Sequence, residues 1–201
     1  MKSYRKVFRD WLRETEGPWR IGQLRVLPAD KGYTLCHVED VSQLSTLQPV
    51  ADQEAWRQLL FFDDKGDFRP LKAAPNFPHG WVFGPLGFDQ LVLALQFAYP
   101  AALAEWAAHR GGHLRVTPWQ ETAERQTGRF KIVAKLNGEQ REELVRGNCA
   151  VACSKHRLWE PGASLANPPL PNDPARLPLL CPEACNYLVG KAREILKGPM
   201  D

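Results

Sequence analysis

The stretch NCAVACSKHRLW, residues 148–159, decides how the C-terminal part of this chain folds. It holds the first of two Cys-x3-Cys pairs, and the second follows in the stretch LLCPEACNYL; the pairs are Cys149 with Cys153 and Cys181 with Cys185. A long proline-rich segment separates the pairs, and compact domains seldom contain so long a connection unless its ends are held together. We therefore expect the four cysteines to form one site that closes this segment.

The composition is typical of a folded globular protein. Of the 201 residues, 44% are hydrophobic and 24% are charged, which argues against a disordered chain and against a membrane protein. The formal net charge is +3, with 26 basic and 23 acidic side chains, so no large positive field covers the molecule. We expect no nucleic-acid partner. A homo-oligomer is compatible with this composition.

The apolar segments do not predict a membrane partner. The N-terminal sequence MKSYRKVFRDWLRETEG lacks the apolar core and the cleavage site of a secretory signal. The longest apolar run, residues 91–108, is interrupted by Gln96 and Pro100 and carries Glu105, which favours two buried helices over a membrane span. We expect a cytoplasmic protein. In that reducing compartment, spaced cysteines favour metal binding or redox chemistry over structural disulfides.

Hydrophobic periodicity and turn residues predict an α+β fold. Amphipathic patterns predict helices at 4–16, 52–62, 89–98, 101–110, 138–148 and 182–198. Runs of β-forming residues predict strands at 20–28, 32–41, 113–119 and 128–136. The first two strands should form a hairpin with Cys36 on its second strand, and the proline- and glycine-rich segment 72–87 should be irregular or lie at an edge.

We expect two domains. Residues 1–137 should form the α+β domain, in which helices pack on short strands. Residues 138–201 should form a small domain that carries the four cysteines and is closed by their metal centre. The boundary is placed near Asn137 and Gly138.

The cysteine spacing suits a metal centre. Side chains four apart on a helix lie on one face, with Cβ atoms about 5–6 Å apart. Cys181 and Cys185 are expected at the start of the last helix, and Cys149 and Cys153 at the end of another, so each pair can face one site. The spacing alone leaves three alternatives open: structural zinc, an iron–sulfur cluster, whose larger body spaces the thiolates more widely, and disulfides or unconnected thiols.

The neighbouring residues favour a cluster among these alternatives. Apolar side chains beside both pairs can shield it from solvent, and the basic residues Lys155, His156 and Arg157 add positive charge. Positive charge stabilises the reduced, more negative form of a cluster.

Several stretches together resemble a known family. The sequences DFRPLKAAPNFPHGW, ALQFAYPAALAEW, ERQTGRFKIVAKL, NCAVACSKHRLW and CPEACNYLVGKARE are similar to the two extra C-terminal domains of some small sirohydrochlorin cobaltochelatases of cobalamin biosynthesis. In that family the first extra domain is stabilising and the second binds a [4Fe-4S] cluster. The resemblance covers roughly residues 3–197.

The resemblance implies an accessory iron–sulfur protein. The residues that match the cluster ligands are Cys149, Cys153, Cys181 and Cys185, and the cofactor implied is a [4Fe-4S] cluster, with zinc as the alternative in a purely interaction-mediating module. The chelatase domain has no counterpart in this sequence, because the five histidines are scattered. No catalytic constellation is visible, so chelation would need a partner such as a cobaltochelatase or another tetrapyrrole-pathway protein.

Other polar clusters have plainer explanations. The pair His109 and His113 flanks two glycines that break a helix, which favours a histidine at a helix end over a metal site. His79 should be a loop residue. We interpret Asp63, Asp64 and Asp67 as a solvated turn. We interpret Arg125, Arg129 and Lys131 as charges on an exposed strand.

Overall fold

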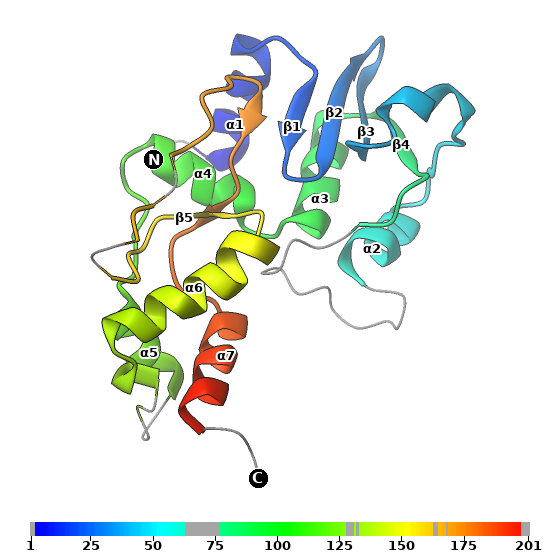
Figure 1. The fold of residues 1–201 in the computed structure, drawn as a ribbon. Helices are drawn as coiled ribbons and strands as arrows, with labels where there is room; N and C mark the ends of the chain where they lie inside the picture. Colours follow the sequence, from blue (N-terminus) through cyan, green and yellow to red (C-terminus); the bar gives the residue numbers. More distant parts are fainter. Residues whose placement is uncertain are drawn as a thin grey trace. The chain divides into compact units, whose positions relative to one another are not determined.

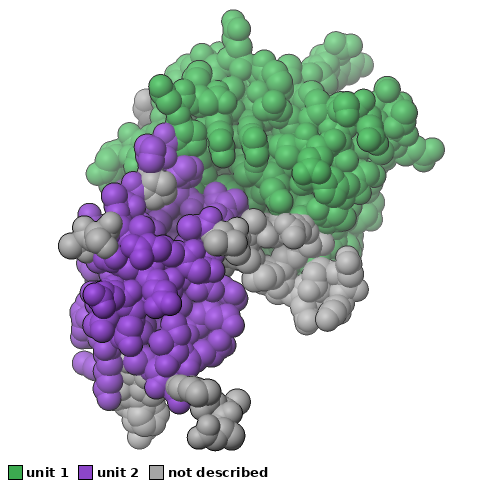
Figure 2. Space-filling view, viewed as in Figure 1, with its two compact units in different colours: residues 1–71, 75–113, 171–179 green, residues 72–74, 114–170, 180–201 purple. Residues whose placement is uncertain are grey.

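The computed structural model describes residues 3–62, 77–127, 131, 133–162, 165–167 and 169–197. The chain forms two compact units, shown in different colours in Figure 2. Unit 1 consists of residues 1–71, 75–113 and 171–179, and unit 2 of residues 72–74, 114–170 and 180–201. Asn137 and Gly138, near which the sequence predicts the domain boundary, both belong to unit 2.

Unit 1 is built on a five-stranded sheet, which confirms the α+β prediction. The strand order is β4-β3-β2-β1-β6, with bounds β1 Trp19–Ile21, β2 Leu24–Ala29, β3 Gly32–His37, β4 Val82–Leu86 and β6 Arg176–Leu177. All neighbours are antiparallel except β1 and β6, which are parallel.

The predicted hairpin is present as β2 and β3, with Cys36 opposite Arg25. The run 20–28 is two strands, because a tight turn at Gly22, where φ is +58°, separates β1 from β2. Glycine adopts this left-handed conformation without steric cost. β4 lies at the edge of the sheet, as expected for its proline-containing segment.

Helices complete unit 1. Their bounds are α1 Tyr4–Glu14, the 3₁₀ helix η1 Val41–Thr46, α2 Gln53–Phe61, α3 Phe88–Ala98 and α4 Ala102–Arg110. α3 packs on β3 and β4, behind the strands in Figure 1, and α1 packs on α4. Asp52 caps α2 by accepting from the N–H groups of Glu54 and Ala55, as its position predicted.

Pro100 separates α3 from α4, which are two helices at 104° to each other. Within the described residues no single helix is long and apolar enough to cross a membrane, and α3 with α4 passes that test only as a bent pair. The apolar face of α3 is buried in the unit, through Leu91, Val92 and Leu95.

In the described residues, unit 2 contains three α-helices, one 3₁₀ helix and two short strands around its own core. The bounds are α5 Trp119–Thr127, the 3₁₀ helix η3 Val133–Lys135, α6 Gly138–Ala152, β5 His156–Arg157, β7 Leu180–Cys181 and α7 Asn186–Lys197. α6 and α7 lie side by side (Figure 1). The core between the helices contains Trp119, Ala123, Leu144, Val145, Trp159, Leu188 and Val189.

The strand predicted at 113–119 is wrong. Residues 113–118 join no ladder, and α5 begins at Trp119, with the Pro118 carbonyl accepting from the Thr122 N–H. In the strand predicted at 128–136, residues 133–135 form η3 instead. Residues 128–130 and 132 lie outside the described residues.

Candidate metal centre

The first cysteine pair lies at the end of α6. A capping box between Asn137 and Gln140 fixes where this helix begins. Cys149 lies in its last turn, and Cys153 is its C-cap, with extended backbone at φ −113° and ψ 128°. The backbone N–H of Cys153 donates to the carbonyl of Cys149 over 3.3 Å. The expectation that this pair follows a helix is therefore met, with the second cysteine outside it.

The second pair is not on a helix, contrary to the expectation. Cys181 is the last residue of β7, and Cys185 precedes α7, where its carbonyl accepts from the Val189 N–H. β7 pairs in parallel with β5, and the Leu158 N–H donates to the Cys181 carbonyl over 3.0 Å, which keeps Cys181 in the strand. The helix begins at Asn186, later than the expected start at Pro182.

The four cysteines form one electrostatic group in unit 2. All are half-buried free thiols. Burial, together with negative charge on the other three cysteines, raises the pKa of the Cys149 thiol to about 12. Burial also raises the pKa of Cys153, and it raises the pKa of Cys181 to about 11. Because metals bind thiolates, a metal centre here forms with release of protons.

The four thiols supply a donor set that suits both metals considered. Structural zinc takes four thiolates in a tetrahedron. A [4Fe-4S] cluster is also held by four cysteine thiolates. The residues present therefore fit either group.

A tryptophan lies beside the second pair. Trp159 is 1% exposed, and its indole Nε1 has no partner at hydrogen-bonding geometry among the described residues. The N–H lies toward the Cys181 sulfur, since it lowers the pKa of that thiol against the larger effect of burial. A buried N–H without an oxygen or nitrogen acceptor fits a neighbouring thiolate, which accepts such contacts.

Positive charge also lies near the sulfur atoms, as the sequence predicted. Arg157 is buried and interacts with the negative charge on Cys149 and Cys181. Lys155 lowers the pKa of Cys153, partly through its backbone N–H. A pocket of about 400 Å³ opens beside the first pair and is lined by Arg146, Cys149, Cys153, Lys155, His156 and Arg157.

Comparisons with known proteins agree with this architecture. Residues 4–110, more than half of the chain, match the family model of the DR2241 stabilising domain. The chain belongs to the DR2241 stabilising-domain family. Residues 111–194 match a 4Fe-4S iron–sulfur cluster binding domain. In this DR2241-family protein the two matched ranges meet near the 113–114 boundary between the units.

One solved structure is similar over almost the whole chain. DR2241 from Deinococcus radiodurans, described as a multi-domain protein with structural similarity to chelatases and two additional novel domains, is 30% identical, with a TM-score of 0.75. The match covers 98% of this chain and 42% of that protein. A comparison with curated proteins found no match. The DR2241-family chain therefore spans less than half the length of this relative.

The other polar residues considered in the sequence of the DR2241-family protein either take the plainer roles expected of them or lie outside the described residues. His109 is in the last turn of α4, and His113 follows the glycines that end this helix, as expected. Arg125 forms an ion pair with Glu183. Lys131 is exposed. The structure does not describe the remaining residues interpreted from the sequence, which are Asp63, Asp64, Asp67 and Arg129.

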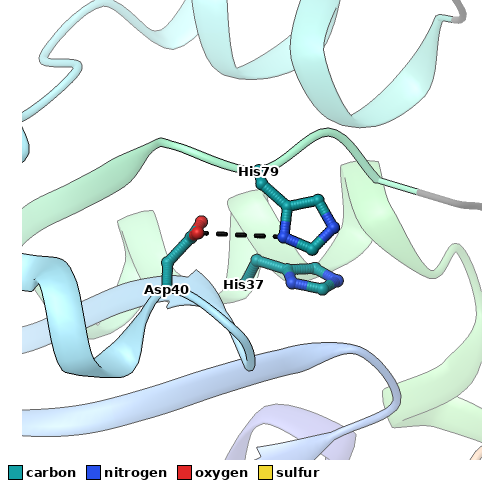
Figure 3. Close-up of side chains that lie close together, drawn as sticks. All are labelled: His37, Asp40 and His79. Atoms are coloured by element: carbon teal, nitrogen blue, oxygen red, sulfur yellow. Dashed lines mark ion pairs between the residues drawn. The ribbon is translucent and has the colours of Figure 1, made fainter.

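One group of ligand-type residues was missed. His37, Asp40 and His79 of the DR2241-family protein lie together in unit 1 (Figure 3), and they are the one group of three such side chains found within 4.8 Å in the described chain. The sequence alone indicates only a loop position for His79, and the structure confirms that position. Its loop precedes β4, and the pairing of β4 with β3 brings it to His37. The sequence HVED at 37–40 was the available signal, since it concentrates ligands at the end of a strand.

Proposed function

We propose that this protein is a [4Fe-4S] cluster-binding accessory protein with Cys149, Cys153, Cys181 and Cys185 as the cluster ligands. The observation that carries the proposal is that the charges of Cys153, Cys181 and Cys185 all act on Cys149, which brings both pairs to one site. The match of residues 111–194 to a cluster-binding domain supports it.

The surrounding residues suit a redox role. A [4Fe-4S] cluster supplies one-electron transfer when bound. Arg157 holds positive charge beside Cys149 and Cys181, and the Trp159 N–H lies toward Cys181. Both contacts favour the more negative, reduced state. The apolar core around Trp119, Trp159 and Leu188 limits the access of water to that side of the site.

We further propose that the protein acts with a cobaltochelatase in cobalamin biosynthesis, in the cytoplasm. The printed description of DR2241 as chelatase-like, together with the family resemblance in the sequence, supports this assignment. Residues 4–110 and 111–194 match a stabilising domain and a cluster-binding domain, so the proposal assigns chelation itself to a separate chelatase domain. The five thiols, all free, suit a reducing compartment.

Anaerobic purification followed by metal and sulfide analysis tests the cofactor. We expect a brown protein with iron and acid-labile sulfide in equal amounts, roughly four of each per chain. Reduction should give the electron paramagnetic resonance signal of a reduced cubane cluster. Stoichiometric zinc with negligible iron, in protein expressed with iron available, would overturn the assignment and identify a zinc-dependent interaction module.

Titration calorimetry with a purified small cobaltochelatase domain tests the partner. We expect saturable binding and an increased rate of cobalt insertion when the cluster-loaded protein is added. The absence of both effects would contradict the partner proposal and would leave the cofactor assignment untouched, since the two measurements are independent.

A further inference from the structure

The group of His37, Asp40 and His79 lies in unit 1, apart in sequence from the cysteines of unit 2. His37 ends β3, Asp40 precedes η1, and His79 lies in the segment that leads to β4. In Figure 3 the two imidazole rings lie next to each other and the Asp40 carboxylate lies beside His79. The ring centroids are 4.1 Å apart, with an interplanar angle of 62°. One ligand atom from each residue lies within 4.8 Å of the other two.

The ring nitrogens of the buried His37 have few hydrogen-bond partners. His37 is 2% exposed, and its Nε2 has no hydrogen-bond partner among the described residues. Its Nδ1 accepts only a long contact of 3.3 Å from the Glu39 N–H. Buried polar side chains in folded proteins normally have partners, and those that do not call for an explanation such as an ion.

The carboxylate is positioned for a further interaction. Asp40 is 5% exposed, and its Oδ2 accepts from the Gly80 N–H over 2.8 Å, which fixes the orientation of the group. Its Oδ1 lies 3.8 Å from Nδ1 of His79. This separation is too long for a hydrogen bond. It is close to the roughly 3.4 Å between nitrogen and oxygen ligands of one tetrahedral ion with bonds of about 2.1 Å.

The donor set selects the class of metal. Imidazole nitrogen and carboxylate oxygen together suit zinc and its first-row neighbours, whereas calcium and magnesium prefer oxygen ligands alone. The exposed Glu39 carboxylate, 3.7 Å from Nδ1 of His79, lies outside this group of three.

We propose that His37, Asp40 and His79 bind one divalent transition-metal ion of the zinc and cobalt class. A simple ion pair of His79 with the acidic residues explains neither the unpaired Nε2 of His37 nor the long distance to Asp40. The ion links the end of β3 to the segment before β4. It therefore stabilises the edge of the sheet in unit 1 through ligand binding to the native state.

Zinc binding to the untagged, full-length protein tests the site. Equilibrium dialysis against buffered zinc, followed by metal analysis, is applied to the wild type, to His79→Ala and to His113→Ala. His79 and His113 are both exposed histidines of unit 1, so His113→Ala is the matched control. The cysteine site contributes equally to all three proteins, and the difference between them reports this site alone.

We expect the wild type and His113→Ala to bind one more zinc ion per chain than His79→Ala, or to bind it with an affinity higher by roughly tenfold or more. Cobalt should give visible ligand-field bands that lack sulfur charge transfer, and His79→Ala should lose them. Zinc should also raise the melting temperature of the wild type more than that of His79→Ala. Equal zinc content and equal cobalt spectra for all three proteins would overturn the proposal, whatever cluster the cysteines hold.

Discussion

Arg157 and Cys181 are directly paired residues of the parallel strands β5 and β7. The pairing brings the second cysteine pair to the residues that follow the first. The Arg157 side chain also donates to the carbonyls of Trp159, Leu165 and Ala166 and to the side chain of Asn167. One buried arginine therefore holds the segment after the first pair and places positive charge beside the sulfur atoms.

Single cysteine substitutions should distinguish the proposed cluster ligands from Cys36. Cys149→Ser and Cys185→Ser are each expected to lose most of the bound iron, because a serine hydroxyl stays protonated where a thiolate is needed. Cys36→Ser should retain it, since Cys36 lies in the sheet of unit 1. Iron and sulfide analysis after anaerobic purification measures the outcome. Full iron content in both ligand variants would contradict the ligand assignment.

Trp159→Phe should lower the reduction potential of the bound cluster. Removing an N–H that favours the reduced state by about 1 kcal/mol shifts a one-electron potential by roughly 40 mV. Trp119→Phe is the matched control: Trp119 stacks on Trp159 with ring centroids 5.9 Å apart, and its N–H also lacks a partner among the described residues. Spectroelectrochemical titration measures both variants, and equal shifts would assign the effect to packing.

Arg157→Gln should destabilise unit 2 by about 2–4 kcal/mol, because it removes buried hydrogen bonds that close the segment after the first cysteine pair. Arg115→Gln is the control, since the Arg115 side chain is 75% exposed and its ion-pair partner Glu121 is 43% exposed. Exposed pairs contribute less than about 1 kcal/mol. Denaturant unfolding followed by circular dichroism compares the two variants; similar midpoints would rule out the structural role of Arg157.

Gly22→Ala should cost more stability than Gly112→Ala. Both glycines have positive φ, +58° and +69°, and an alanine in this conformation costs about 1–2 kcal/mol. A Cβ at Gly22 also collides with the Tyr99 hydroxyl, whereas nothing lies within 4 Å of a Cβ at Gly112. The collision adds about 1–3 kcal/mol. Thermal unfolding of the two variants measures the difference, and equal melting temperatures would show that the turn yields without cost.

Tyr99 should make stability fall at alkaline pH. Its hydroxyl is buried and accepts from the Gln23 N–H, and burial raises the pKa of Tyr99 well above its ordinary value. Above about pH 10 the unfolded tyrosine ionises while the native one keeps its proton. The native state therefore loses up to about 1.4 kcal/mol per pH unit from this group. Tyr99→Phe should show a shallower decline in unfolding titrations between about pH 9 and 11; an unchanged slope would refute this explanation.

Local signals in the sequence predicted much of the fold. The turn residues between β2 and β3 and the break at Pro100 act over a few residues, so their effects are visible without the rest of the chain. The four cysteines were likewise found from their spacing and their surroundings.

The sequence by itself determined the α+β class, the boundaries of most helices and the identity of the candidate cysteine site. Only the tertiary structure decided that Cys181 lies on a strand, that residues 113–118 form no ladder, and that His37 and His79 meet. These features depend on contacts between distant segments, as when β5 holds β7 extended or β4 pairs with β3. Local propensities are weak beside such pairings, so no pattern within a short window encodes them.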